Sequence, residues 1–358
     1  MSIEFIGIAI TAAGSESQGF AGPVIDTDYL ERLVRTHEDA GFDRVLVAHS
    51  SAMPDGFVVA DQILSRTTTL KVLLAHRPGF VSPTVAARSF ATLDAFHPGR
   101  IALHVITGGD DADQARDGDL ADKVTRYRRT DEFLDVLRRE WESTAPFDYD
   151  GEFYTVRGAS SWVRPPAGRI PIYFGGASAD AIRVGGRHAD VYAFWGEPLA
   201  GIAERIAQVR AAAAAHGRDP RFSVSLRPIP ADTEQAAWDR AAHILELTRE
   251  RASEVRKVFN IDGPASVGSQ RLLRYAGDGE VHDKRLWTAI AKATGAAGNS
   301  TALVGSYEQV AESLVDYVGV GVSTLLIRGF DPLADAQDYG TLVRLVREQT
   351  ADRRPVPA

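Results

Sequence analysis

Two neighbouring segments carry polar residues whose types and spacing could bind an anion and a ring. His104 and Thr107 belong to the apolar run Ile101–Gly109, which predicts a buried strand stopped by a Gly-Gly turn. Arg126 and Tyr127 open a long predicted helix after an acidic loop. In open and closed parallel sheets, ligands bind where strands end and helices start. We therefore expect a phosphorylated cofactor at the carboxyl edge of a parallel sheet.

A second candidate for anion binding is Gly175-Gly-Ala-Ser178, which follows a predicted strand and opens a predicted helix. The free backbone amides of a helix start, together with a serine hydroxyl, can bind a phosphate, which makes Gly176 and Ser178 candidates. The alternative is an ordinary N-capping serine preceded by glycines that form a tight turn. The chain has no Walker or GxGxxG pattern that would name the ligand.

Three further residues stand at the ends of predicted strands. Arg227 and Arg328 each close a strand that is otherwise apolar. They could form a salt bridge at the rim of the sheet, or bind an oxyanionic substrate through their planar guanidinium groups. Trp195, in Trp195-Gly-Glu-Pro198, is either a buried aromatic before a turn or one wall of a pocket. His104 is similarly ambiguous, because a lone histidine in an apolar strand is more often a core residue than a catalyst.

The composition excludes several classes of protein. A chain of 358 residues with 44% hydrophobic content can bury a large core. Its net charge of −8 argues against a protein that binds nucleic acid through charge. The absence of cysteine excludes disulfides, thiolate metal sites and a cysteine nucleophile, and no HExxH or EF-hand pattern predicts a metal site. With neither a secretory signal nor a membrane-length apolar run at hand, we expect a cytoplasmic protein.

Strand-like and helix-like segments alternate along the chain without a break in composition. The predicted strands cover residues 5–11, 44–48, 70–76, 101–106, 172–174, 191–195, 223–229 and 322–327. The predicted helices cover 28–40, 57–66, a stretch from 84 that Pro83 starts, 126–141, 179–188, 199–216, 236–251, 307–318 and 334–348. Eight strand–helix units favour an α/β fold of the (β/α)8 TIM-barrel type, as one domain over 1–358, rather than two doubly wound domains.

Two regions are longer than the loops of a minimal barrel. Residues 142–169 contain the hairpin-like sequence Phe147–Val156. Residues 252–300 form a long polar and glycine-rich insertion. Long excursions in a compact domain are often functional, and catalytic groups of barrels lie on loops after the strands. We therefore expect the 252–300 insertion to be a lid.

The strings described above resemble the bacterial luciferase-like flavin monooxygenases, and within them the alkanesulfonate monooxygenase group. The match spans nearly the whole chain. Its pieces are Arg77-Pro, Val81–Arg88, Ala91–Asp94, Val105–Gly109, Arg126-Tyr127, Tyr173–Ser178, Trp195–Pro198 and Thr301–Gly305.

The resemblance implies a TIM barrel that receives reduced FMN (FMNH2) from a separate NAD(P)H-dependent FMN reductase and assembles as a homodimer or homotetramer. In the implied reaction O2 adds to the reduced flavin, and the adduct attacks a small substrate. A sulfonate would then yield sulfite and an aldehyde. The implied flavin contacts are His49, Ser50, His104, Asp113, Arg126, Tyr127 and Ser178. Relatives often carry asparagine where this chain has His104.

The chain departs from the sulfonate-cleaving relatives at the substrate end. An arginine and a histidine near their seventh strand end are matched here by Ser225 and Arg227, and a later tyrosine is matched by Phe330. A mobile-loop arginine is matched by the neutral tract 295–300. We expect Arg227 and Arg328 to hold a small anionic substrate, an organosulfonate being favoured, with Trp195 beside the flavin. The alternatives are an F420-dependent oxidoreductase, an oxygenase of a non-sulfonate substrate, and a flavin-binding protein without catalysis.

Overall fold

The computed structural model describes residues 3–251, 266–296 and 298–351. Of the predicted lid, residues 252–265 and 297 lie outside the described residues. The chain divides into two compact units. Unit 1 comprises the residues up to Val45, Ala193–Gln208 and the residues from Arg221 on, and unit 2 comprises Leu46–Tyr192 and Val209–Pro220. The division passes through strands β2 (Arg44–Val47) and β8 (Val191–Trp195) and through helix α7 (Leu199–Ala214), so each of these elements contributes residues to both units.

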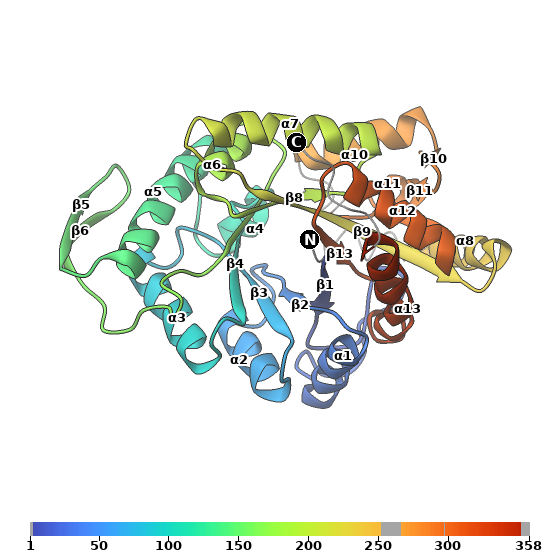
Figure 1. Ribbon diagram of the computed structural model, residues 1–358, viewed down its shortest axis with the longest axis horizontal. Coiled ribbons are helices and arrows are strands. Elements are labelled where there is room, and N and C mark those ends of the chain that lie inside the picture. Colours follow the sequence, from blue (N-terminus) through green and yellow to red (C-terminus); the bar gives the residue numbers. More distant parts are fainter. Residues whose placement is uncertain (1–2, 252–265, 297, 352–358) are drawn as a thin grey trace. The chain divides into compact units, whose positions relative to one another are not determined.

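Unit 2 consists of parallel strands that alternate with helices (Figure 1). Strand β4 pairs with β3 and β7 in parallel. The elements that lie wholly in unit 2 are α2 (Gly56–Arg66), β3 (Lys71–His76), α3 (Pro83–Phe96), β4 (Ile101–Val105), α4 (Asp111–Arg116), α5 (Lys123–Glu142), β5 (Phe147–Asp150), β6 (Thr155–Ala159), β7 (Ile172–Gly175) and α6 (Ala179–His188). Pro83 opens α3 as predicted, since proline lacks the N–H that a first helical turn leaves unpaired.

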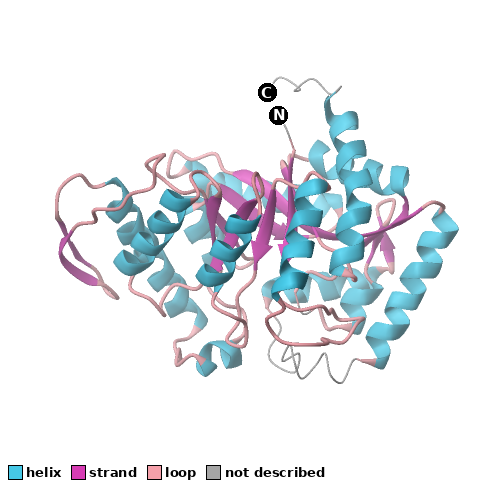
Figure 2. Cartoon of the chain, turned by 90° about the horizontal axis from the view of Figure 1, so that it is seen from below, coloured by secondary structure: helices cyan, strands magenta, loops and turns pink. Residues whose placement is uncertain are grey.

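The predicted hairpin of region 142–169 is present as the antiparallel pair β5–β6. It extends beyond α5, at the left of Figure 1, and is the small separate sheet of Figure 2. Glu132 on α5 accepts hydrogen bonds from the backbone N–H groups of three successive turn residues, Glu152, Phe153 and Tyr154. The hairpin is therefore tied to α5 at its turn.

Unit 1 contains the strands from both ends of the chain. Its elements are β1 (Glu4–Ala9), α1 (Thr27–Asp39), β9 (Arg221–Ala231), α8 (Glu234–Glu250), α10 (Val267–Asp278), β10 (Val281–His282), β11 (Leu286–Trp287), α11 (Ala289–Ala293), β12 (Ala302–Ser306), α12 (Tyr307–Gly319), β13 (Thr324–Ile327) and α13 (Pro332–Ala351). Strand β13 pairs in parallel with β1 on one side and with the first half of β9 on the other.

Strand β12 was not predicted. Strand β9 is longer than its neighbour, and its second half, from Arg227 to Ala231, pairs in parallel with β12 after the pairing with β13 has ended. The described part of the insertion continues this edge, because β11 pairs with β12 and β10 pairs with β11, both antiparallel. The described part of the insertion therefore contains regular elements, of which β10 and β11 extend the sheet of unit 1.

The predicted fold class is confirmed. The strand order β13-β1-β2-β3-β4-β7-β8-β9, in which β9 also pairs with β13, is that of a (β/α)8 barrel. The prediction of one domain over 1–358 is not tested by this order and stays a prediction. No helix among the described residues is both long and apolar enough to cross a membrane.

Candidate functional site

The side chain of His104 lies on the face of the unit 2 sheet that its helices leave uncovered. His76 contacts the rings of three helix residues, Phe57, Phe90 and Phe133, at centroid distances of 6.1, 5.7 and 5.6 Å. His76 is in register with Val105, and Ala75 with His104. Because residues in register share a face and successive residues alternate, His104 lies on the face opposite to the helices. In a barrel that face is the interior.

One nitrogen of the His104 ring has no hydrogen-bond partner among the described residues. Its Nδ1 is buried without a hydrogen bond. Burial lowers the pKa of His104 to about 4, so the imidazole is neutral near pH 7. An orphaned buried nitrogen costs roughly 1–3 kcal/mol, and a bound ligand with a complementary polar edge would offset that cost. The role of His104 as a flavin contact stays a prediction, and its position suits that role.

A polar cluster at the ends of β2 and β3 contains Asp113 and a residue that was not predicted as a site residue, Arg77. Asp113 accepts hydrogen bonds from the backbone N (3.2 Å) and Oγ (2.6 Å) of Ser51, and it forms an ion pair with Nη2 of Arg77. Burial opposes ionisation of Asp113, but these contacts outweigh it and lower the pKa of the carboxyl. Asp113 therefore holds Arg77 in place, while Nε and Nη1 of Arg77 are buried without a partner.

His49 belongs to the same cluster, and Ser50 shapes the loop beside it. Burial and then the charge of Arg77 lower the pKa of His49, whose Nε2 is buried without a partner. The Oγ of Ser50 accepts a weak hydrogen bond from the backbone N of Ala52 at 3.4 Å. The cluster thus presents unpaired nitrogens of His49 and Arg77 at the strand ends. Only the motif Arg77-Pro after a predicted strand could have signalled Arg77.

The second candidate anion site is assembled by Ser178, Gly176 and Tyr127. The Oγ of Ser178 caps α6 by accepting from the backbone N of Ala181 at 3.2 Å, and it also hydrogen-bonds Tyr127. Gly176 has φ +149°, where a side chain would be strained. A Cβ added there would lie 2.5 Å from Cβ of Ala181 and 3.1 Å from the hydroxyl of Tyr127. The glycine therefore lets its backbone lie closer to the start of α6 and to the Tyr127 hydroxyl than a residue with a side chain could.

Arg126, although adjacent to Tyr127, is used elsewhere. Its guanidinium is almost fully buried and donates to the backbone O of Ala121 (2.5 Å) and to Asp111 (2.5 Å). Successive residues of a helix point about 100° apart, which separates the two side chains. Arg126 closes the acidic loop that contains α4. Its role as a flavin contact stays a prediction, and the structure shows a structural use of its two Nη groups.

In unit 1 both predicted substrate arginines contact one carboxylate, that of Glu16, in the loop after β1. Nη1 and Nη2 of Arg227 donate to Oε1 (2.8 Å) and Oε2 (3.0 Å) of Glu16. Arg328 forms an ion pair with the same Oε1. Arg227 lies within β9 rather than at its end, where the pairing with β13 stops and that with β12 begins. The salt-bridge alternative is thus present in this structure, and the oxyanion role stays a prediction.

Trp195 packs against the insertion. A Cβ on Gly268 of α10 would lie 3.0 Å from the Trp195 ring, and the ring also packs against a small core formed by Leu272, Ala291 and Ala296. Two residues later, Glu197 forms a bidentate ion pair with Arg271 of α10, with N–O distances of 2.7 and 2.6 Å. The motif Trp195-Gly-Glu-Pro198 therefore anchors α10 at the end of β8.

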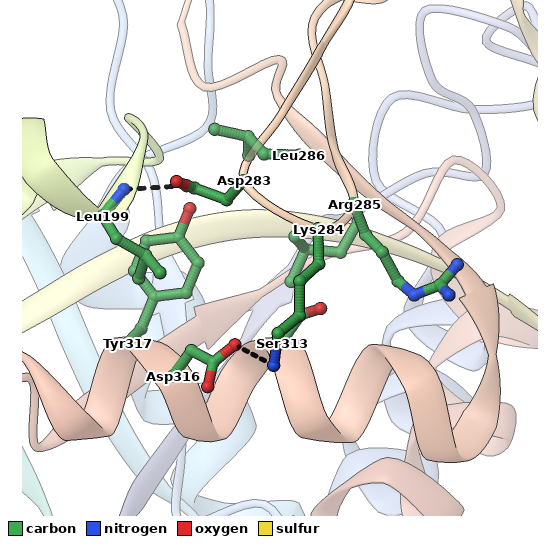
Figure 3. Close-up of a pocket in the computed structure, with 9 residues that line it drawn as sticks. Leu199, Asp283, Lys284, Arg285, Leu286, Ser313, Asp316 and Tyr317 are labelled. Carbon is green, nitrogen blue, oxygen red and sulfur yellow. Dashed lines mark hydrogen bonds and ion pairs between the residues drawn. The ribbon is translucent and has the colours of Figure 1, made fainter.

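The loop between β10 and β11 gives the insertion a second attachment in unit 1 (Figure 3). The backbone N of Leu199, at the start of α7, donates to Oδ2 of Asp283 at 2.8 Å. Nζ of Lys284 lies 2.9 Å from Oδ2 of Asp316 on α12. Among the described residues, no group of three or more His, Cys, Asp and Glu side chains could hold a metal ion.

The fold is shared with several flavin and deazaflavin enzymes. Riboflavin lyase, solved with modified FMN and riboflavin, is 19% identical with a TM-score of 0.84 over 100% of this chain and 94% of its own. EDTA monooxygenase from Chelativorans sp. BNC1 is 19% identical with a TM-score of 0.79 over 99% and 95%. An F420-dependent secondary alcohol dehydrogenase is 16% identical with a TM-score of 0.72 over 97% and 99%.

At such identities these likenesses show the fold alone. The family is shown by the match of residues 4–324 to the model of the luciferase-like monooxygenases. That match covers most of the chain and includes the polar cluster of Arg77, the Gly176–Ser178 site and Arg227, while Arg328 follows its last residue. This protein belongs to the luciferase-like monooxygenase family.

Proposed function

We propose that this protein is an FMNH2- and O2-dependent monooxygenase that acts on a small anionic organic substrate, an organosulfonate being favoured. The observation that carries the proposal is the set of unpaired buried nitrogens at consecutive strand ends of unit 2. They belong to His49, Arg77 and His104. Such groups suit the polar edge of an isoalloxazine, which offers both hydrogen-bond donors and acceptors.

The phosphate of FMN would be held at the start of α6. Backbone amides at a helix start favour an anion, and the hydroxyls of Ser178 and Tyr127, which hydrogen-bond each other, lie at that helix start close to the Gly176 backbone. The residues present therefore fit FMN at both ends, ring and phosphate. Reduced FMN, when bound, supplies the electrons that activate O2 for transfer of one oxygen atom to the substrate.

The chain's own residues would bind, orient and shield the reactants. Neutral His104 can hydrogen-bond the ring without adding a charge. The unpaired Nε and Nη1 of Arg77, held in place by Asp113, would donate hydrogen bonds to the flavin ring. Helix α10, anchored to Trp195 and Glu197, would help to exclude water from the substrate end.

Further parts of the proposal concern partners. Following the family resemblance, we propose that a separate NAD(P)H-dependent FMN reductase supplies the reduced flavin. We also propose a homodimer or homotetramer. Size-exclusion chromatography with light scattering measures the assembly directly.

The cofactor is tested by titrating the purified protein with FMN and with F420 while following fluorescence quenching. Preferential binding of FMN supports the proposal, and preferential binding of F420 would replace it with the hydride-transfer alternative. Sulfite release is then measured with supplied FMNH2 over alkyl, aromatic and sugar sulfonates. Sulfite from at least one of them is the expected result. Substrate-dependent O2 uptake without sulfite would move the proposal to oxygenation of another substrate class.

A further inference from the structure

The loop after β1 fastens Glu16 over the arginine pair. Ser15 Oγ donates to the backbone O of Phe330 at 2.5 Å, and Gln18 Nε2 donates to Oδ2 of Asp331 at 3.2 Å. A hydrogen bond from the backbone N of Ser15 to the backbone O of Gln18 (2.7 Å) closes the loop between them. Glu16 is therefore held on both sides by contacts to the turn after β13.

The carboxylate of Glu16 occupies both Nη atoms of Arg227. Both Nη atoms of Arg227 bind Glu16, Nη2 also donates to the backbone O of Gly329 at 2.8 Å, and the guanidinium lies 3.5 Å from the ring centre of Phe330. The Arg227 side chain is 1% exposed. A fork filled in this way cannot bind a second oxyanion in bidentate fashion.

Arg328 differs from Arg227 in the guanidinium nitrogens that Glu16 leaves unoccupied. Only its Nη2 contacts Glu16, whereas both Nη atoms of Arg227 do, and its side chain is 26% exposed. The Nε is buried without a partner in both arginines. Two guanidinium charges and one carboxylate leave a single net positive charge. Arg328 can therefore still bind an anion, and one negative charge suffices to balance the group.

We infer that Glu16 is a specificity-determining residue, a resident carboxylate that fills Arg227 and leaves Arg328 to bind one singly charged oxyanion. The inference rests on the proposed function, since it narrows the anionic substrate to monoanions such as sulfonates or carboxylates. Dianions such as phosphate monoesters would meet the carboxylate of Glu16 without a full complement of positive charge.

The test compares two tetrahedral anions that differ in charge, methanesulfonate and sulfate, by isothermal titration calorimetry of the flavin-free protein. Wild type is expected to prefer methanesulfonate. Coulomb energy scales with the product of the charges, so if E16Q strengthens monoanion binding by about tenfold it strengthens dianion binding by about a hundredfold. The preference then moves by about tenfold toward sulfate. E31Q, which removes an exposed carboxylate on α1, is the matched control and should leave the preference unchanged.

R328Q provides a second arm, because E16Q leaves Arg227 buried without its partner and can lower stability. R328Q keeps the pair of Arg227 and Glu16 and is expected to lose methanesulfonate binding by at least about tenfold. Three results would each overturn the inference. They are an equal charge preference in wild type and E16Q, unchanged methanesulfonate binding in R328Q, and no binding of methanesulfonate by wild type. A failure of FMN binding would instead defeat the proposed function, and it is measured in a separate titration.

Discussion

Replacing Ser178 by alanine tests separately the two roles of its hydroxyl, the observed helix cap and the proposed phosphate contact. The Oγ caps α6 at 3.2 Å from the backbone N of Ala181, and in the proposal it also binds the FMN phosphate. Loss of an N-cap costs about 1 kcal/mol. With an unfolding entropy of about 2.1 cal/mol/K per residue, a chain of this length loses roughly 1–2 °C in Tm. A cap without a ligand role would show this effect alone.

The effect on FMN binding should be larger than the effect on stability. A hydrogen bond to a charged group contributes roughly 1.5–3 kcal/mol, which corresponds to a roughly tenfold to hundredfold loss in affinity. The assay is quenching of FMN fluorescence during titration with protein. Riboflavin, which lacks the phosphate, serves as the second ligand and should bind S178A as well as it binds wild type.

Thr233→Ala is the matched control. Thr233 caps α8 through the backbone N of Ala236, also at 3.2 Å, and no ligand role is proposed for it. T233A should show the same small fall in Tm with unchanged FMN affinity. The phosphate assignment is refuted if S178A weakens FMN and riboflavin equally, or if S178A and T233A bind FMN alike.

Three further predictions concern buried polar groups. Burial lowers the pKa of His76 to about 4 from its ordinary 6.5, so an unfolded chain takes up the proton first and stability falls as pH drops from about 6.5 to about 4. Urea unfolding at both pH values measures this loss, which should be about 3 kcal/mol smaller in H76F than in wild type. H243Q, at an exposed position, is the control and should lose as much stability as wild type. An equal loss in H76F and wild type would contradict the reasoning. E197Q should raise hydrogen–deuterium exchange over Val267–Asp278 because α10 loses its ion pair, and unchanged exchange would show that the pair does not anchor the helix. D113N should lower the free energy of unfolding by about 3 kcal/mol because Arg77 is left as a buried charge, and a loss below about 1 kcal/mol would show that the pair is not a buried anchor.

Much of the fold was predictable because its elements have strong periodic patterns. Helix Ala179–His188 and strand Val191–Trp195 have the predicted bounds. Strand β12 escaped prediction because it is five residues long and pairs with the far half of β9, which is remote in sequence. Helix α4 escaped because the side chain of its N-cap, Asp110, stabilises six mostly polar residues that have no apolar period.

The candidate site was predictable where its residues are local, and less so where it depends on distant pairs. Gly176 and Ser178 are neighbours in a recognisable turn, and the structure brings Tyr127 to them. Glu16 lies 211 residues before Arg227, and nothing in either local sequence indicates that they pair. Arg77 and Asp113 are 36 residues apart and gave no joint signal for the same reason.

The pairing of β1 with β13 determines how long one edge of β1 stays unpaired during synthesis of the chain. Glu4 is in register with Thr324, so β1 emerges 320 residues before the strand that covers this edge. At typical synthesis rates that interval is roughly 15–60 s, during which one edge of β1 has no strand to pair with. An uncovered edge is a template for association with other chains. Truncation before β13 should therefore yield aggregates rather than a shortened barrel, because the edge of β1 would then stay uncovered.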